Sequence, residues 1–432
     1  MLDPILAHGV GRVYESPIPA YLYALGAGGT VLASFLLRAL AGDRRPRRKD
    51  RKIAGSRAAA LVAAALRIAG LAALALLTAS AVVVEGGGLT LPALLFWVGL
   101  IVGTTTLSAV LGGVWRAADP WATIEGFYRI EDSGARSVDP PWWVGPALLY
   151  LLFWFELVSS VGFEPAGVLA AVLVYALLSF SFRHRLGDRW ALVDPLSILF
   201  GFASLIAPLK LRDDGIHYRG LSGLDRRDAM PRALFASVFV LLASTTLDNL
   251  TETLAWSDFV TATGLDALPA EIVDSVALAA FALLFLAPFL GALAAARGRM
   301  AGAGGLGTIA RSFGWSLVPI GVAYVLAHNA PLLISGIPQL LRALSDPFAL
   351  GWNVLGTAEL FEGFLPSPQL VWYVEIAVII GGHVLGVLAA HRTAVALAGD
   401  HRGAVRSQYS LTILMSVYTI ATLWLLAQPL VV

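Results

Sequence analysis

The chain has no cysteine among its 432 residues, which excludes disulfide bonds, thiolate metal sites, iron–sulfur clusters and cysteine nucleophiles. Charged residues are also scarce: they make up 14% of the chain, against 58% hydrophobic residues and a mean hydropathy of +0.76. A soluble protein of this size needs far more polar surface to cover its core. The same balance excludes collagen-like, disordered and nucleic-acid-binding proteins. The sequence therefore predicts an integral membrane protein whose partner is the lipid bilayer.

Long apolar runs, separated by short polar loops, organise the whole chain. Each run is about long enough to cross a ~30 Å hydrocarbon core as a helix, and none alternates with a period of two as a transmembrane barrel would. The predicted spans are 18–41, 58–84, 91–114, 141–161, 165–182, 231–256, 270–296, 312–336, 367–391 and 408–429. We expect an all-α transmembrane bundle of about ten spans, forming a single integral membrane domain over residues 1–432.

The basic residues predict the orientation of these spans. Of the 30 Lys and Arg, Arg12 and Arg342 would lie on one side, Arg67 lies inside a span, and the remaining 27 lie on the opposite side. Basic loops mark the cytoplasm. We therefore expect a multi-pass plasma-membrane protein with both termini outside, without a cleavable signal peptide.

Three connecting segments are distinctive. We expect a basic cytoplasmic loop at 42–57, a cytoplasmic loop with an interfacial helix at 183–230, and an extracytoplasmic loop at 337–366. The strings WRAADPW at 115–121 and WALVDPL at 190–196 share the pattern Trp-x-x-x-Asp-Pro, a weak repeat. Asp before Pro is also a helix N-cap signal, and we interpret Asp119, Asp194 and Asp346 in this way.

Ionisable side chains inside the spans are the best candidates for function, because each costs at least about 2.5–3.5 kcal/mol at the bilayer centre unless it is paired or faces water. They are Arg67, Glu156, Asp248, Glu252, His328 (beside Asn329), Glu375, His383 and His391. Residue counting along straight helices places four of them in one depth band, in the middle or outer half of the bilayer. Those four are Glu156, Asp248, His328 and His383. Glu252 and Glu375 fall near the outer mouth, and His391 near the cytoplasmic interface.

Two carboxylates and two imidazoles at one depth predict a metal site formed by His328, His383, Asp248 and Glu156. These donors suit a divalent transition metal, and such a set with an open position is typical of a catalytic centre. Asn329, Thr245 and Thr246 are candidates to orient the ligands, and Arg67 to pair with a carboxylate such as Glu156. Two alternatives stay open: a proton or ion path through the same residues, and ordinary interhelical hydrogen bonds. A single haem between His328 and His383 is a weaker one.

Several strings resemble a prokaryotic family of polytopic membrane proteins labelled fenitrothion hydrolase, over most of the chain. They are FWFELV at 153–158, DPLSILFGFASLIAPL at 194–209, LLASTTLDNL at 241–250, SLVPIGVAYVLAHNAP at 316–331, GGHVLGVLAAHRTA at 381–394 and SQYSLTILMSVYTIATLWLLAQP at 407–429. The resemblance implies hydrolysis of an organophosphate ester. The four predicted metal ligands and Asn329 all fall inside these strings.

The sequence thus leaves three functions. The first is a metal-dependent hydrolase in which the metal activates a water, with catalytic residues unassigned. The second is a cation- or proton-coupled transporter, and the third a haem-binding membrane subunit of a redox complex. A partner subunit or a homo-oligomer stays open in each case.

Overall fold

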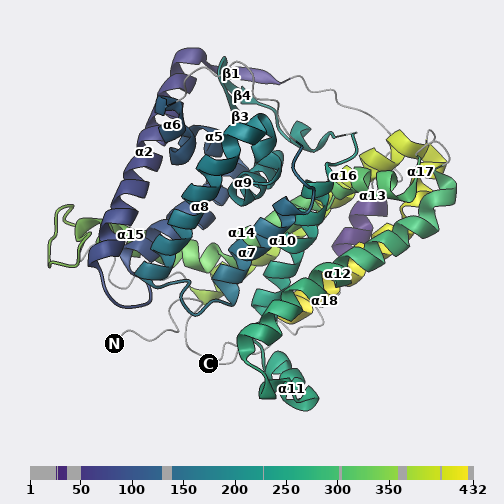
Figure 1. The fold of residues 1–432 in the computed structure, drawn as a ribbon. Helices are drawn as coiled ribbons and strands as arrows, with labels where there is room; N and C mark the ends of the chain where they lie inside the picture. Colours follow the sequence, from purple (N-terminus) through teal and green to yellow (C-terminus); the bar gives the residue numbers. More distant parts are fainter. Residues whose placement is uncertain are drawn as a thin grey trace. The chain divides into compact units, whose positions relative to one another are not determined.

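The computed structural model describes residues 26, 28–36, 50–128, 139–226, 228–300, 304–358, 367–398 and 401–426. Helices dominate this part of the chain (Figure 1). Within the described residues, six helical stretches are long and apolar enough to cross a membrane: Ser56–Val83, Leu91–Val110, Pro165–Ile206, Arg232–Thr251, Ala270–Arg299 and Leu370–Ala398. A bent pair of helices at Leu306–His328 makes seven if it counts as one span. An all-α chain with several membrane-type helices is therefore confirmed.

The chain divides into two compact units. The first unit comprises 1–10, 49–220 and 329–367, and the second comprises 11–48, 221–328 and 368–432. The helices of the first unit are α2 (Ser56–Val83), α3 (Leu91–Ala93), π-helix η2 (Leu94–Gly103), α4 (Thr104–Val110), α5 (Val114–Ala118), α6 (Pro120–Tyr128), α7 (Val144–Leu157), α8 (Pro165–Leu186), η3 (Gly187–Leu192), α9 (Pro195–Ile206) and α15 (Ala330–Ser345).

A small sheet in the first unit was not predicted. Its strands are β1 (Arg51–Gly55), β2 (Leu111–Gly112), β3 (Leu209–Arg212) and β4 (Gly215–Tyr218), in the order β1-β4-β3-β2. β4 pairs antiparallel with β1 and β3, while β2 and β3 are parallel. β1 and the β3–β4 hairpin lie where loops were expected, at 42–57 and 183–230. These strands are only four or five residues long, and a search for long apolar runs does not detect them.

Helix α9 forms much of the buried core of the first unit. Phe200 and Phe202 are almost inaccessible, as are most of their neighbours on this helix, which lies within the segment 183–230. Its N-cap is Asp194, whose carboxylate accepts the amides of Leu196 and Ser197, each at 3.2 Å. Asp119 accepts the Ala122 amide at 3.0 Å before α6. The Asp-Pro interpretation is thus confirmed at two of its three positions.

At the third position, Asp346 closes a loop instead of starting a helix. It follows α15 and accepts the amides of Leu350 at 2.8 Å and Gly351 at 2.9 Å. Desolvation alone would raise the pKa of this carboxyl, but the loop amides outweigh it and hold the pKa below its usual value. The helix α15 and this turn fill most of the predicted loop 337–366, whose residues 359–366 lie outside the described part.

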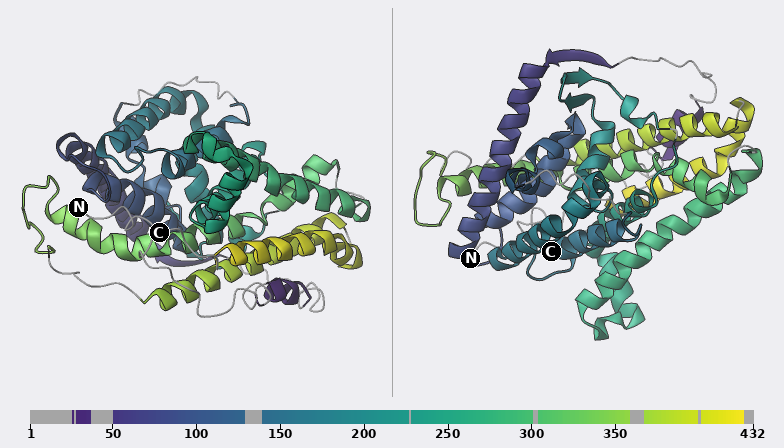
Figure 2. Two further views of the ribbon diagram at one scale, coloured as in Figure 1. Left: turned by 90° about the horizontal axis from the view of Figure 1, so that it is seen from below. Right: turned by 45° about the horizontal axis from the view of Figure 1, so that its top comes forward.

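The second unit is built from α-helices that range from seven to 31 residues in length. They are α10 (Arg232–Thr251), α11 (Leu254–Thr263), α12 (Ala270–Ala296), α13 (Leu306–Gly314), α14 (Val318–His328), α16 (Pro368–Ala398), α17 (His401–Ser407) and α18 (Tyr409–Leu426), with 3₁₀ turns η4 (Ser222–Leu224), η5 (Leu265–Ala267) and η6 (Arg297–Arg299). Helix α12 runs beside α18 in every view, and α14 packs closely on α16 (Figures 1 and 2). Close packing is possible at Gly382, where an added Cβ would lie 2.3 Å from that of Ala323.

The predicted span 312–336 is not one helix. It bends by 41° between α13 and α14, where the Ser316 amide bonds to the Phe313 carbonyl at 2.9 Å in a tightened turn. Pro319 contributes here, because proline has no amide hydrogen to continue the α-helical pattern. Helix α14 then ends at His328, and α15 begins at Ala330 with Pro331 in its first turn. Depth counted from Ser312 along a straight helix was therefore a wrong basis for placing His328.

Candidate functional site

The clearest polar contact inside the second unit joins α10 to α14. Nε2 of His328, the last residue of α14, lies 2.5 Å from Oδ2 of Asp248, near the end of α10. Each side chain is 14% exposed. An imidazole nitrogen and a carboxyl oxygen at this distance are joined by a short hydrogen bond. The structure thus brings together two of the four residues predicted to share a site.

The other imidazole nitrogen of His328, Nδ1, also has a hydrogen-bond partner. Nδ1 of His328 lies 3.3 Å from Oδ1 of Asn249, whose Nδ2 donates to the Thr245 carbonyl at 2.6 Å. Because the Thr245 carbonyl only accepts, it fixes the amide with its oxygen toward the imidazole. Nδ1 must therefore donate. One further proton then lies between Nε2 and the carboxylate, so that the pair is either imidazolium with carboxylate or imidazole with carboxylic acid.

Two more carboxylates act on this pair. Glu252 follows α10 directly and interacts electrostatically with both Asp248 and His328, and Glu375 on α16 interacts with His328. Thr253 orients the chain here, because its hydroxyl donates to the Leu250 carbonyl at 2.7 Å and accepts the Trp256 amide at 3.3 Å. Three acids around one imidazole give the site an excess of acid, which favours binding of a proton or another cation.

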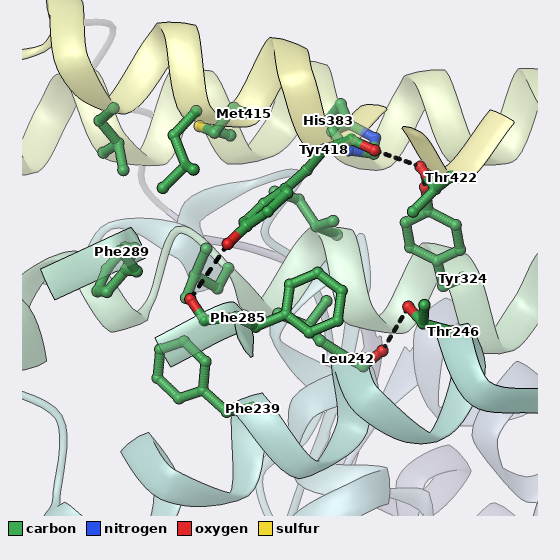
Figure 3. Close-up of a pocket in the computed structure, with 14 residues that line it drawn as sticks. Phe239, Leu242, Thr246, Phe285, Phe289, Tyr324, His383, Met415, Tyr418 and Thr422 are labelled. Carbon is green, nitrogen blue, oxygen red and sulfur yellow. Dashed lines mark hydrogen bonds between the residues drawn. The ribbon is translucent and has the colours of Figure 1, made fainter. Parts of the chain in front are cut away.

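His383 occupies a different environment. It is 2% exposed, and its Nδ1 donates to the Ile379 carbonyl at 2.9 Å on its own helix. Its ring meets that of Tyr324 edge to face, with centroids 5.9 Å apart. Figure 3 shows it at an apolar cavity with Tyr324, Tyr418 and Thr422.

The remaining predicted residues lie on several elements of the two units. In the first unit, Glu156 lies half-buried on α7 and Arg67 is exposed on α2, and Arg67 forms no ion pair within the described ranges. His391, expected at the interface, is fully buried and its Nδ1 accepts from Gln408 Nε2 at 3.1 Å. Asn329 lies at the break between α14 and α15.

The hydroxyl hydrogens of Thr245 and Thr246, the two threonines predicted to orient metal ligands, are donated within helix α10. The hydroxyl of Thr245 lies 3.2 Å from the Leu242 carbonyl, and that of Thr246 lies 2.9 Å from the same atom, so both bond to their own helix. The residue that does orient His328 is Asn249, which was not predicted. Its signal was a neutral amide beside Asp248 in the string LDNL, the kind of side chain that hydrogen-bonds between membrane helices.

The described residues contain no group of three or more His, Asp or Glu arranged to hold a metal ion. The metal site of four ligands therefore stays a prediction. No family model, no curated protein and no solved structure matches the chain. The geometry of the Asp248–His328 pair is accordingly the main basis for a functional assignment.

Proposed function

We propose that the protein is a multi-pass plasma-membrane protein that binds and passes a proton at the Asp248–His328 pair, as a proton-coupled transporter does. The observation that carries this proposal is the 2.5 Å contact between Nε2 of His328 and Oδ2 of Asp248, with Nδ1 already committed to Asn249. The pair has one proton to share, and loss of that proton changes its charge by one unit. Such a group is the minimum that proton coupling needs.

The surroundings of the pair support this role. Glu252 and Glu375 interact with the imidazole and provide neighbouring carboxyl groups to or from which a proton can pass. The helical backbone also ends at this point, because His328 is the last residue of α14. Helices that break at ionisable groups are typical of the binding sites of secondary transporters.

The orientation belongs to the same proposal: ten spans with both termini outside. It is tested by single cysteines, since the chain has none of its own. A membrane-impermeant thiol reagent applied from outside should label Ala262→Cys and Leu350→Cys, and should leave Arg48→Cys and Ser222→Cys unmodified. The reverse labelling would overturn the orientation.

Infrared difference spectroscopy of the protein in lipid, between acid and alkaline pH, tests the proton site directly. Wild type should show a carboxylic-acid band from Asp248 that is missing in Asp248→Asn and altered in His328→Gln. In vesicles with an entrapped pH dye and an imposed membrane potential, proton uptake should fall to the level of protein-free vesicles in both variants.

Asp274→Asn is the matched control for these measurements. It removes a carboxylate from α12 of the same unit, where Asp274 interacts with Glu271 and Trp256 and not with the pair. Its spectrum should keep the band assigned to Asp248. Superimposable spectra of wild type and Asp248→Asn would show that the pair does not titrate, and the proposal would be lost.

A metal-dependent hydrolase, as the family resemblance implies, is the competing proposal for the same residues. An imidazole nitrogen and a carboxylate oxygen are both donors that transition metals accept, which is the observation in its favour. Metal analysis of purified protein separates the two: stoichiometric metal in wild type that is absent from His328→Ala supports the hydrolase, whereas equally little metal in both supports the proton site.

A further inference from the structure

The small sheet of the first unit adjoins two helical stretches that are long and apolar enough to cross a membrane. Strand β1 ends at Gly55, directly before α2 begins at Ser56, and strand β2 begins at Leu111, directly after the stretch Leu91–Val110 ends. Hydrogen-bonded pairs through β3 and β4 join β1 to β2. Figure 1 shows β1, β3 and β4 at one end of α2. The sheet therefore lies where these stretches would leave the hydrocarbon core, at the level of the lipid headgroups.

This sheet and its flanks carry an excess of positive charge. The segments 50–57, 111–116 and 209–219 contain seven basic residues and three acidic ones. Each acid already has a partner, in the pairs Asp50–Arg212 at 2.5 Å, Asp213–Arg116 at 2.7 Å and Asp214–His217 at 3.0 Å. The acids of these segments therefore do not neutralise all of their cations.

Three exposed cations form no ion pair within the described residues, namely Arg51, Lys52 and Arg57. Lys52 interacts electrostatically with Asp214, an acid that it shares with His217. The three cations fall within seven residues of the chain, on β1 and in the first turn of α2. Like charges held this close repel one another, so the approach of an anion is favourable.

Apolar and aromatic side chains are interspersed with these cations. Ile53 follows Lys52 on β1 and is 53% exposed. Arg51 lies opposite Tyr218 in the register of β1 and β4, so their side chains project from the same face of the sheet, and Tyr218 is 38% exposed. Tyrosine and long basic side chains are typical of the interface between membrane and water. This mixture favours a layer of lipid headgroups over a soluble anion, which would leave Ile53 in water.

We propose that the surface formed by Arg51, Lys52, Ile53, Arg57 and Tyr218 binds anionic phospholipids beside α2. The cations bind the phosphate groups, and Ile53 and Tyr218 contact the upper part of the acyl chains. The attraction is electrostatic, so it weakens as the salt concentration rises. The argument needs neither the Asp248–His328 pair nor an orientation of the chain, because headgroups cover both faces of a bilayer. The surface therefore goes beyond the proposed proton-binding function.

Fluorescence quenching in vesicles tests the proposal on the full-length protein. The chain has no cysteine, so Ser56→Cys can carry a single bimane label at the start of α2. The quenchers are phosphatidylglycerol and phosphatidylcholine that carry the same nitroxide on the upper acyl chain, in both leaflets. The labelled protein should prefer phosphatidylglycerol at least about tenfold, because each nearby Lys or Arg contributes a factor of about five. The preference should disappear at high salt.

Three sets of substitutions in this labelled protein locate the preference. Arg51→Gln with Lys52→Gln should reduce it to about twofold or less, whereas Arg51→Lys with Lys52→Arg keeps both charges and should keep it. The matched control is Arg297→Gln with Arg299→Gln, which removes two exposed basic residues from η6 of the second unit. This control should leave the preference unchanged. Asp248→Asn should do so as well, and a failure of the proton-site proposal therefore leaves this one standing.

The phosphatidylcholine quencher also reports on folding, since unchanged quenching by it in the glutamine variant of β1 shows that the start of α2 keeps its place in the bilayer. Equal quenching by the two lipids in the labelled protein without further substitution would overturn the proposal. A preference that survives the two glutamines of β1 would overturn it too. So would an equal loss in the control at η6, because the lipid would then respond to the net charge of the protein and not to this surface.

Discussion

Each of the two units contains buried carboxylates that accept hydrogen bonds, but the groups that donate those hydrogen bonds differ between the units. In the first unit, Arg183 lies 2.7 Å from Asp119 and 3.5 Å from Glu125, and Asp194 accepts the Tyr175 hydroxyl at 2.8 Å besides two helix amides. Arginine and amides hold their hydrogens permanently. In the second unit, Asp248 meets an imidazole, a side chain that can both bind and release a proton. The first arrangement therefore stabilises a fold, and the second is suited to proton transfer.

The largest effect on stability should come from breaking the ion pair between Asp119 and Arg183 in the first unit. Asp119→Ala leaves the guanidinium of Arg183, whose side chain is 15% exposed, without its nearest carboxylate. Removing one partner of a buried ion pair costs about 3–5 kcal/mol. Unfolding in mixed detergent micelles should show a loss of that size. A double variant with Asp119→Leu and Arg183→Met should recover most of it, and a wild-type unfolding curve for Asp119→Ala would contradict a structural role.

An intermediate effect is expected at Asp194. Tyr175→Phe removes the hydroxyl that donates to the buried carboxylate and leaves the packing of the ring against Trp121 in place. The loss of one such hydrogen bond is worth about 1 kcal/mol, and bonds to a charged group are somewhat stronger. The same unfolding assay measures it. Because Asp194 keeps its two helix amides, a loss as large as that of Asp119→Ala would mean that the hydroxyl does more than this geometry implies.

Sequence reasoning reached the helices and the Asp-Pro caps because both follow from local signals, namely the length of an apolar run and the dipeptide itself. It predicted which residues form the site less completely. Depth along a helix says nothing of the direction in which a side chain points, so Asp248 and His328 meet while His383 lies among aromatic rings. The bend after Gly314 and the end of α14 at His328 both lie inside one long apolar run, and the length of such a run does not reveal them.

The smallest effect on stability should come from a change in the Asp248–His328 pair. This prediction is also the sharpest test of the difference between the two units. In Asp248→Asn, the new amide can still donate to Nε2 of His328 while Nδ1 donates to Asn249, so the variant resembles the state with a protonated carboxyl. We expect unfolding free energies within about 1 kcal/mol of wild type, because both nitrogens of His328 keep a hydrogen-bond partner. The dependence of stability on pH that the pair contributes should disappear, as measured by unfolding curves between mildly acid and mildly alkaline pH. A loss comparable to that of Asp119→Ala would place the Asp248–His328 contact with the structural ion pairs, and the distinction between the two units would fail.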